Sequence, residues 1–155
     1  MRIELPTAAD THALGVTLST VLRAGDLIIL SGPLGAGKTA LAQGIGAGLG
    51  VDGPVTSPTF VISRIHGGGR LRMVHVDAYR LGSVSEVDDL DLDAGFDDSV
   101  TVVEWGEGKA EQLSEEHLIV HLERHVDDDV RIAELEPVGA AWRARLEELP
   151  ALSRP

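Results

Sequence analysis

Apolar residues recur at helical spacing twice in the first fifty residues, and an unbroken apolar run separates the two stretches. The first stretch predicts a helix that begins at a capping box formed by Thr7 and Asp10 and stops at Gly25. Its apolar positions are Leu14, Leu18, Val21 and Leu22. The run 27–30 is typical of a strand buried on both faces. Apolar positions Leu41, Ile45 and Leu49 then predict a second helix that ends at Gly50, and its three internal glycines favour close packing on a sheet.

Shorter apolar segments in the remaining two thirds of the chain predict mainly strands. Segments 59–66 and 71–77 flank three glycines and predict a hairpin, and 100–103 predicts a further buried strand. A second hairpin is expected from 118–122 and 130–135, and a last helix stops at Pro150. The order of helices and strands favours an α/β fold with a mixed sheet in a single domain, residues 1–155, with 150–155 as a flexible tail.

Composition narrows the functional classes. The 155 residues contain no cysteine, which excludes disulfides, thiolate metal sites and a cysteine nucleophile and fits a cytoplasmic protein. No apolar run approaches the length of a membrane span. The formal net charge of −12 disfavours direct binding of nucleic acid or anionic lipid. His117, His121 and His125 are spaced too widely for one metal ion, and we expect them at the surface.

A glycine-rich loop between the buried run and the second helix carries the strongest chemical signal. Gly32 to Thr39 matches the complete pattern G-x-x-x-x-G-K-S/T. In such loops glycines let backbone N–H groups face a phosphate, the lysine adds a mobile positive charge, and the hydroxyl ligates magnesium. The residues predicted to bind the nucleotide are Leu34, Gly35, Ala36, Gly37, Lys38 and Thr39. The sequence therefore predicts a site for a nucleoside triphosphate and Mg²⁺, in a P-loop NTPase-like three-layer sandwich with a partly parallel sheet.

Two predicted strands end in carboxylates that a triphosphate site would need. The strand 100–103 leads into Glu104, as in a Walker B strand, and the strand 71–76 leads into Asp77. The alternative is that each carboxylate caps its strand or pairs with an arginine. Thr59, in the segment 57–60, could sense a γ-phosphate or orient water, although from the residues alone an ordinary Ser-Pro turn is favoured there.

The order of these motifs resembles the TsaE (YjeE) family of bacterial ATPases, which serve threonylcarbamoyladenosine synthesis on tRNA. The resemblance rests on the loop 35–39 followed by the segments 57–60, 75–81 and 103–105, and it extends over nearly the whole chain. Two positions depart from the family pattern. Pro33 stands in the loop where the family often has an acid, and Ala78 replaces a larger apolar residue.

The resemblance implies a role for each matched residue. Lys38 and Thr39 would hold phosphate and magnesium, and Glu104 would act on magnesium and water. Asp77 would be a second acidic nucleotide-site residue, and Thr59 a switch-like threonine. The resemblance also implies ATP and Mg²⁺ as ligands, and docking on the partner proteins TsaD and TsaB, with tRNA reached only through that complex. ATP hydrolysis would reset the complex between turnovers.

Three functions use a loop of this kind, and the residues alone leave them open. They are an ATPase that acts on a protein complex, a small-molecule kinase, and a nucleotide-binding switch with little hydrolysis. Against the kinase, the loops 52–58 and 83–98 contain no arginine that could form a lid over the phosphates. The chain has no N-K-x-D guanine motif, which favours ATP. Besides Lys38, Arg80 is the basic residue expected near the phosphates.

Overall fold

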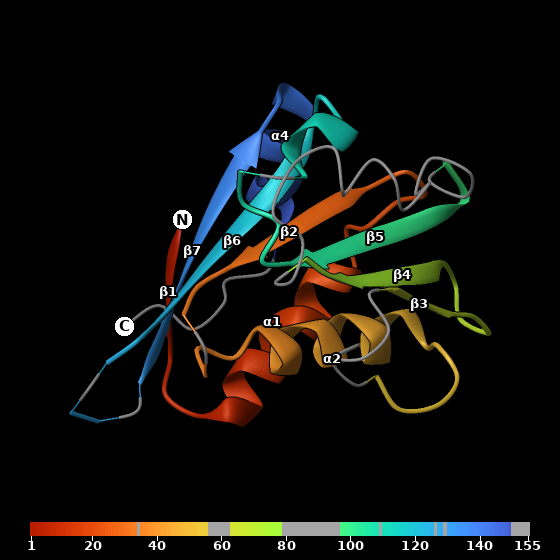
Figure 1. The fold of residues 1–155 in the computed structure, drawn as a ribbon. Helices are drawn as coiled ribbons and strands as arrows, with labels where there is room; N and C mark the ends of the chain where they lie inside the picture. The colour runs from red at the N-terminus through yellow and green to blue at the C-terminus, as the bar shows by residue number, and fades with distance from the viewer. Residues whose placement is uncertain are drawn as a thin grey trace.

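The computed structural model describes residues 1–33, 35–55, 63–78, 97–108, 110–125, 127–128 and 130–149. Within these ranges seven strands form one mixed sheet in the order β1-β7-β6-β2-β5-β4-β3 (Figure 1). The strands are β1 Arg2–Leu5, β2 Leu27–Ser31, β3 Ser63–His66, β4 Arg72–Asp77, β5 Ser99–Glu104, β6 His117–Arg124 and β7 Arg131–Val138. Neighbouring strands from β6 through β2 and β5 to β4 are parallel, and the remaining pairs are antiparallel. The predicted α/β class and both predicted hairpins are confirmed.

The helices cover the sheet. They are α1 Ala8–Ser19, α2 Lys38–Leu49 and α4 Ala140–Glu148, and a 3-10 helix, η2, spans Glu111–Leu113. The predicted capping box at the start of α1 is present: Thr7 Oγ1 accepts from the backbone N–H of Asp10, and the Asp10 carboxylate accepts from the backbone N–H of Thr7. No helix within the described ranges is long and apolar enough to cross a membrane.

Helix α1 ends earlier than the sequence predicted. It stops at Ser19 rather than at Gly25, and the chain continues as turns. The guanidinium of Arg70 donates to the carbonyl oxygens of Ser19 at 2.6 Å and Leu22 at 3.1 Å. These long-range bonds satisfy carbonyl groups at the end of the helix, which a longer helix would have used internally. A side chain 51 residues distant in sequence thus binds the end of α1 and the turn that follows it.

The glycines of α2 serve helix–helix packing rather than packing on the sheet alone. A Cβ at Gly44 would collide with the carbonyl oxygen of His12, and a Cβ at Gly48 would collide with Ser19 Oγ. Gly15 of α1 faces the backbone of α2 in the same way. The two helices consequently lie side by side at backbone distance against the sheet (Figure 1).

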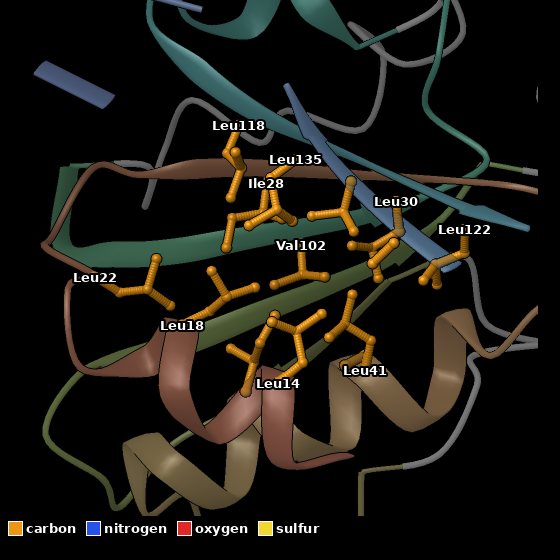
Figure 2. Packing of buried hydrophobic residues seen from close by; sticks show 14 of the residues in the cluster. Leu14, Leu18, Leu22, Ile28, Leu30, Leu41, Val102, Leu118, Leu122 and Leu135 are labelled. Carbon is orange, nitrogen blue, oxygen red and sulfur yellow. The ribbon is translucent and has the colours of Figure 1, made fainter. Parts of the chain in front are cut away.

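The core has two parts, one on each face of the sheet. The larger cluster includes Leu14 and Leu18 of α1 and Leu41 of α2, which face Ile28 and Val102 of the sheet (Figure 2). Trp142 and Leu146 of α4 belong to the same cluster. The smaller cluster contains Leu27, Ile29, Val76, Val103, Ala110 and Ile119, with Leu113 packed against it. Strand β2 is thus buried on both faces, as predicted, and the segment around η2 covers the face opposite α1 and α2.

Two details of the strands differ from the sequence analysis. β1 was not predicted; it pairs antiparallel with β7, and its alternating exposure buries Ile3 and Leu5. His117, the first residue of β6, is buried rather than at the surface, and its Nδ1 lies 3.0 Å from the carbonyl oxygen of Ser114. Thr59, Leu34, Arg80, most of the loop 83–98 and the tail 150–155 lie outside the described residues.

Candidate functional site

The glycine-rich loop connects β2 in the middle of the sheet to α2. Gly37 precedes α2 with φ of 106°, a conformation that favours glycine, and the helix begins at Lys38 as predicted. Gly32 passes so close to β6 that a Cβ there would collide with the carbonyl oxygen of Leu122. The first turn of a helix has N–H groups without intrahelical acceptors, so the loop and the start of α2 present donors to an anion.

The side chain of Lys38 is folded back onto the loop and is only 5% exposed. Its Nζ donates to the carbonyl oxygens of Gly32 at 2.6 Å and Pro33 at 2.9 Å, and it lies 3.7 Å from the centroid of the Trp105 ring. Burial lowers the pKa of Lys38 below its ordinary value, while the carboxylates of Glu104 and Asp77 oppose this shift. The ammonium therefore lies within the field of both predicted carboxylates.

Glu104 connects the loop helix to the neighbouring strand. It is the last residue of β5 and is 3% exposed. The Thr39 hydroxyl donates to Glu104 Oε1 at 3.3 Å, and His75 Nε2 lies 2.5 Å from Glu104 Oε2. The parallel register pairs Asp77 with Glu104, so the two strands deliver their carboxylates side by side beside the loop.

The donor set of this site fits Mg²⁺. A threonine hydroxyl and a carboxylate are hard oxygen ligands of the kind that Mg²⁺ prefers. Within the described ranges no group of three or more His, Asp or Glu side chains could hold a metal ion alone. Mg²⁺ usually uses one or two protein ligands together with substrate oxygens and water. Thr39 and Glu104 are the residues that could hold it.

Trp105 has an unusual backbone conformation at the end of β5. Its φ of 61° is left-handed, and it is the single non-glycine residue with positive φ in the described part of the chain. Its backbone N–H donates to the carbonyl oxygen of Leu30 at 3.0 Å, which ties this turn to β2. Holding a bulky residue in this conformation costs about 1–3 kcal/mol, and such strain concentrates at functional sites. Here it places the indole ring over the Lys38 ammonium.

Two arginines that the sequence analysis did not place at the site lie beside the loop. Arg124 Nη1 is 3.5 Å from the position that a Cβ of Gly35 would take, and Arg131 Cδ is 3.5 Å from the equivalent position at Gly37. The two arginines are register partners at the turn end of the β6–β7 hairpin. Their place at the loop depends on the order of strands in the sheet, which the sequence alone did not predict. β6 pairs parallel with β2, so the carboxyl end of β6 lies beside the loop that follows β2. Arg80 is thus not alone as a basic candidate.

Three comparisons with known proteins bear on this site. Residues 5–132 match the family model described as "Threonylcarbamoyl adenosine biosynthesis protein TsaE". Proteins named "tRNA threonylcarbamoyladenosine biosynthesis protein TsaE" are 54% identical over 138 residues in Mycobacterium tuberculosis, covering 83% of this chain and 82% of that protein. The Streptomyces coelicolor protein of the same name is 55% identical over 135 residues, covering 83% and 91%. The crystal structure of Bacillus subtilis YdiB superimposes with a TM-score of 0.79 at 28% identity, covering 96% of this chain and 92% of that one.

Proposed function

The chain belongs to the TsaE family of threonylcarbamoyl adenosine biosynthesis proteins, as the order of its motifs predicted, and we propose that it is an ATPase that supports threonylcarbamoyladenosine modification of tRNA. The modification is the process for which the related proteins are named. ATP binding and hydrolysis with magnesium are the activity that we assign to the loop and its neighbouring carboxylates.

One observation carries the proposal: the Thr39 hydroxyl meets the buried Glu104 carboxylate at 3.3 Å, directly beside Lys38. Burying a carboxylate is costly unless it is hydrogen-bonded, paired or bound to a metal, and Glu104 meets Thr39 and His75 and lies in the field of Lys38. Two oxygen ligands and an ammonium at the start of a helix form the combination that a magnesium–triphosphate requires. The same three residues are the ones that the resemblance named.

Each residue then has a distinct task in the proposed reaction. The backbone N–H groups of residues 35–39 and the Lys38 ammonium would bind the phosphates, with Lys38 exchanging its carbonyl partners for phosphate oxygens. Thr39 and Glu104 would hold magnesium, which when bound neutralises charge on the phosphate oxygens. Asp77, paired in register with Glu104, would orient water at the same edge of the sheet. Thr59 remains our candidate for a γ-phosphate sensor.

The proposed ATPase works on a protein complex. By family resemblance the partners are TsaD and TsaB, and tRNA is reached through them. The net charge of −12 supports this arrangement, because a strongly acidic chain repels the phosphates of tRNA.

Phosphate release from ATP by the purified chain, with TsaD, TsaB and tRNA supplied, tests the activity. We expect Glu104→Gln to keep nucleotide affinity within a few fold at saturating Mg²⁺ and to lower kcat at least ~100-fold, because a metal ligand contributes several kcal/mol to the transition state. Asp77→Asn should also lower turnover. Glu147→Gln, on the exposed side of α4, is the matched control and should behave as wild type. Wild-type turnover in Glu104→Gln would remove Glu104 from the reaction.

A further inference from the structure

The buried histidine of β4 has a role that the motifs do not assign. His75 is fully buried, and its Nε2 lies 2.5 Å from Glu104 Oε2, between residues 29 positions apart in sequence. We propose that His75 is a positioning residue that fixes the Glu104 carboxylate so that only Oε1 is presented to Thr39 and the metal. This inference rests on the proposed function, because it assigns a purpose to the orientation of Glu104.

The two oxygens of Glu104 have partners of different kinds. Oε1 accepts from Thr39, which is partly exposed at the start of α2, whereas Oε2 is bonded to a ring with no exposed surface. His75 occupies one lone pair of Oε2 from the buried side, whereas Oε1 lies toward the partly exposed Thr39. The carboxylate is therefore set up to bind a metal through one oxygen, and rotation about its terminal torsion, which is otherwise broad, would break the bond to His75.

The hydrogen of this contact belongs to the histidine, because an ionised carboxylate has none to donate. The other ring nitrogen, Nδ1, is buried and has no hydrogen-bond partner among the described residues. The tautomer with hydrogen on Nε2 alone leaves no N–H unpaired, since a lone pair without a donor costs less than a buried N–H without an acceptor. The centroid of the His66 ring, on the neighbouring edge strand β3, lies 6.5 Å from the centroid of the His75 ring.

The strand register explains why a histidine is suited to this position. His75 and Asp77 point to the same face of β4, the face that carries α2, and Asp77 is opposite Glu104 on β5. His75 is opposite Val102, two residues before Glu104 on β5, so its side chain must reach diagonally across the two strands to touch Glu104. The imidazole carries its donor at the far end of a rigid ring, so it spans that distance with few torsions to order.

The test separates positioning from simple packing. His75→Leu removes the donor at similar volume, and His75→Gln keeps an N–H donor near the Nε2 position. We expect His75→Leu to raise the Mg²⁺ concentration for half-maximal ATP binding about 10- to 100-fold, as loss of a bond that orients a metal ligand does elsewhere. ATP affinity in EDTA should stay within a few fold, and His75→Gln should recover most of the Mg²⁺ dependence. Calorimetric titrations of ATP at several Mg²⁺ concentrations give these values.

The chain offers a matched control in a second histidine–glutamate pair. His121 Nε2 lies 2.9 Å from Glu136 Oε2 on the partly exposed side of the β6–β7 hairpin. His121→Leu should leave the Mg²⁺ dependence unchanged. In a Glu104→Gln background, His75→Leu should cause no further change, because the carboxylate that His75 holds is gone.

Each contrary outcome is distinct. A His75→Leu protein with a lower melting temperature and wild-type Mg²⁺ dependence would overturn the inference and leave the proposed function standing. If His75→Leu does not fold, His75→Asn replaces it, since its shorter amide keeps a polar group without reaching Glu104; equal Mg²⁺ dependence of the Asn and Gln variants would then overturn the inference. A wild-type chain that binds no ATP in Mg²⁺ would overturn the proposed function and the inference together.

Discussion

At the scale of single residues, Lys38 shows how the loop is organised before a phosphate arrives. Its ammonium is held by two carbonyl oxygens of its own loop and by the Trp105 ring. These are neutral partners, so a triphosphate, with full negative charges, competes with them effectively. The folded-back lysine keeps a buried charge satisfied while leaving it ready for exchange.

Lys38→Ala should weaken ATP binding about 10- to 100-fold, the equivalent of about 1.5–3 kcal/mol for a hydrogen bond to a charged group. The loop dipoles alone cannot neutralise a triphosphate as well as dipoles and an ammonium together. Calorimetric titration with ATP and Mg²⁺ measures the change. Arg143→Ala, an exposed basic residue of α4, is the control for loss of one positive charge. Equal affinities for Lys38→Ala and wild type would remove Lys38 from the site.

Trp105 should report on nucleotide binding through its fluorescence. The indole lies 3.7 Å from the Lys38 ammonium, and a phosphate that draws this charge away changes the field at the ring. The chain has two tryptophans, and the other, Trp142, is buried in α4. A fluorescence titration with ATP and Mg²⁺ should therefore give a signal that survives Trp142→Phe and disappears in Trp105→Phe. A signal that disappears instead in Trp142→Phe would contradict the contact.

At the scale of elements, the glycines of α1 and α2 set the position of the loop helix. Because Gly44 and Gly15 bring the two backbones together, α2 cannot shift without moving α1. We expect Gly44→Ala to destabilise the fold by about 1–3 kcal/mol through overpacking, although alanine favours helix over glycine by about 1 kcal/mol.

Urea unfolding of Gly44→Ala checks this expectation. Gly67→Ala is the control, because a Cβ there meets nothing within 4 Å. Equal free energies of unfolding for Gly44→Ala and Gly67→Ala would mean that α1 and α2 move apart at little cost. The packing of the two helices would then not fix the position of the loop.

The elements also show what the sequence could and could not predict. The buried run of β2, the glycine loop and the start of α2 at Lys38 follow from local patterns, and all three are where they were expected. The contact of Arg70 with the end of α1 and the packing of the α2 glycines on another helix both needed three-dimensional information. The clustering of Glu104 and Asp77 could be anticipated, because adjacent parallel strands end at one edge of a sheet.

Local patterns missed two other parts of the site for the same reason. In the sequence His75 is only the first residue of the matched segment 75–81. Its contact with Glu104 could not be predicted, because Glu104 lies on another strand. Arg124 and Arg131 belong to no motif that the sequence analysis used, and they reach the loop because β6 pairs with β2. Contacts between distant segments, rather than local spacing, decide these positions.

At the scale of the whole molecule, the chain is strongly acidic, but basic side chains gather at the proposed nucleotide site. The net charge is −12, yet the loop carries Lys38 and has Arg124 and Arg131 beside it. A local basic site in an acidic protein can attract a nucleotide while the rest of the surface repels longer polyanions. The charge pattern thus favours ATP over tRNA as the direct ligand.

The last prediction is that the chain alone is a slow ATPase whose turnover rises at least ~10-fold with TsaD and TsaB. Phosphoryl transfer is fast when positive charge reaches the γ-phosphate in the transition state, and a partner protein that supplies or positions an arginine can raise kcat by about 10³–10⁵. Arg124 and Arg131 approach the loop at Gly35 and Gly37, whereas the γ-phosphate would lie toward Lys38 and the strand-end carboxylates.

Steady-state ATP turnover measures the effect. It is compared for the chain alone, for the chain with the partner pair, and for that mixture with tRNA added. Lys38→Ala in the full mixture gives the background. Fast turnover by the chain alone, unchanged by partners, would contradict the prediction and favour a small-molecule kinase. Tight binding of tRNA by the isolated chain at physiological salt would also contradict the prediction. It would show that the acidic surface does not prevent direct binding of a polyanion, so that partners are not needed to reach tRNA.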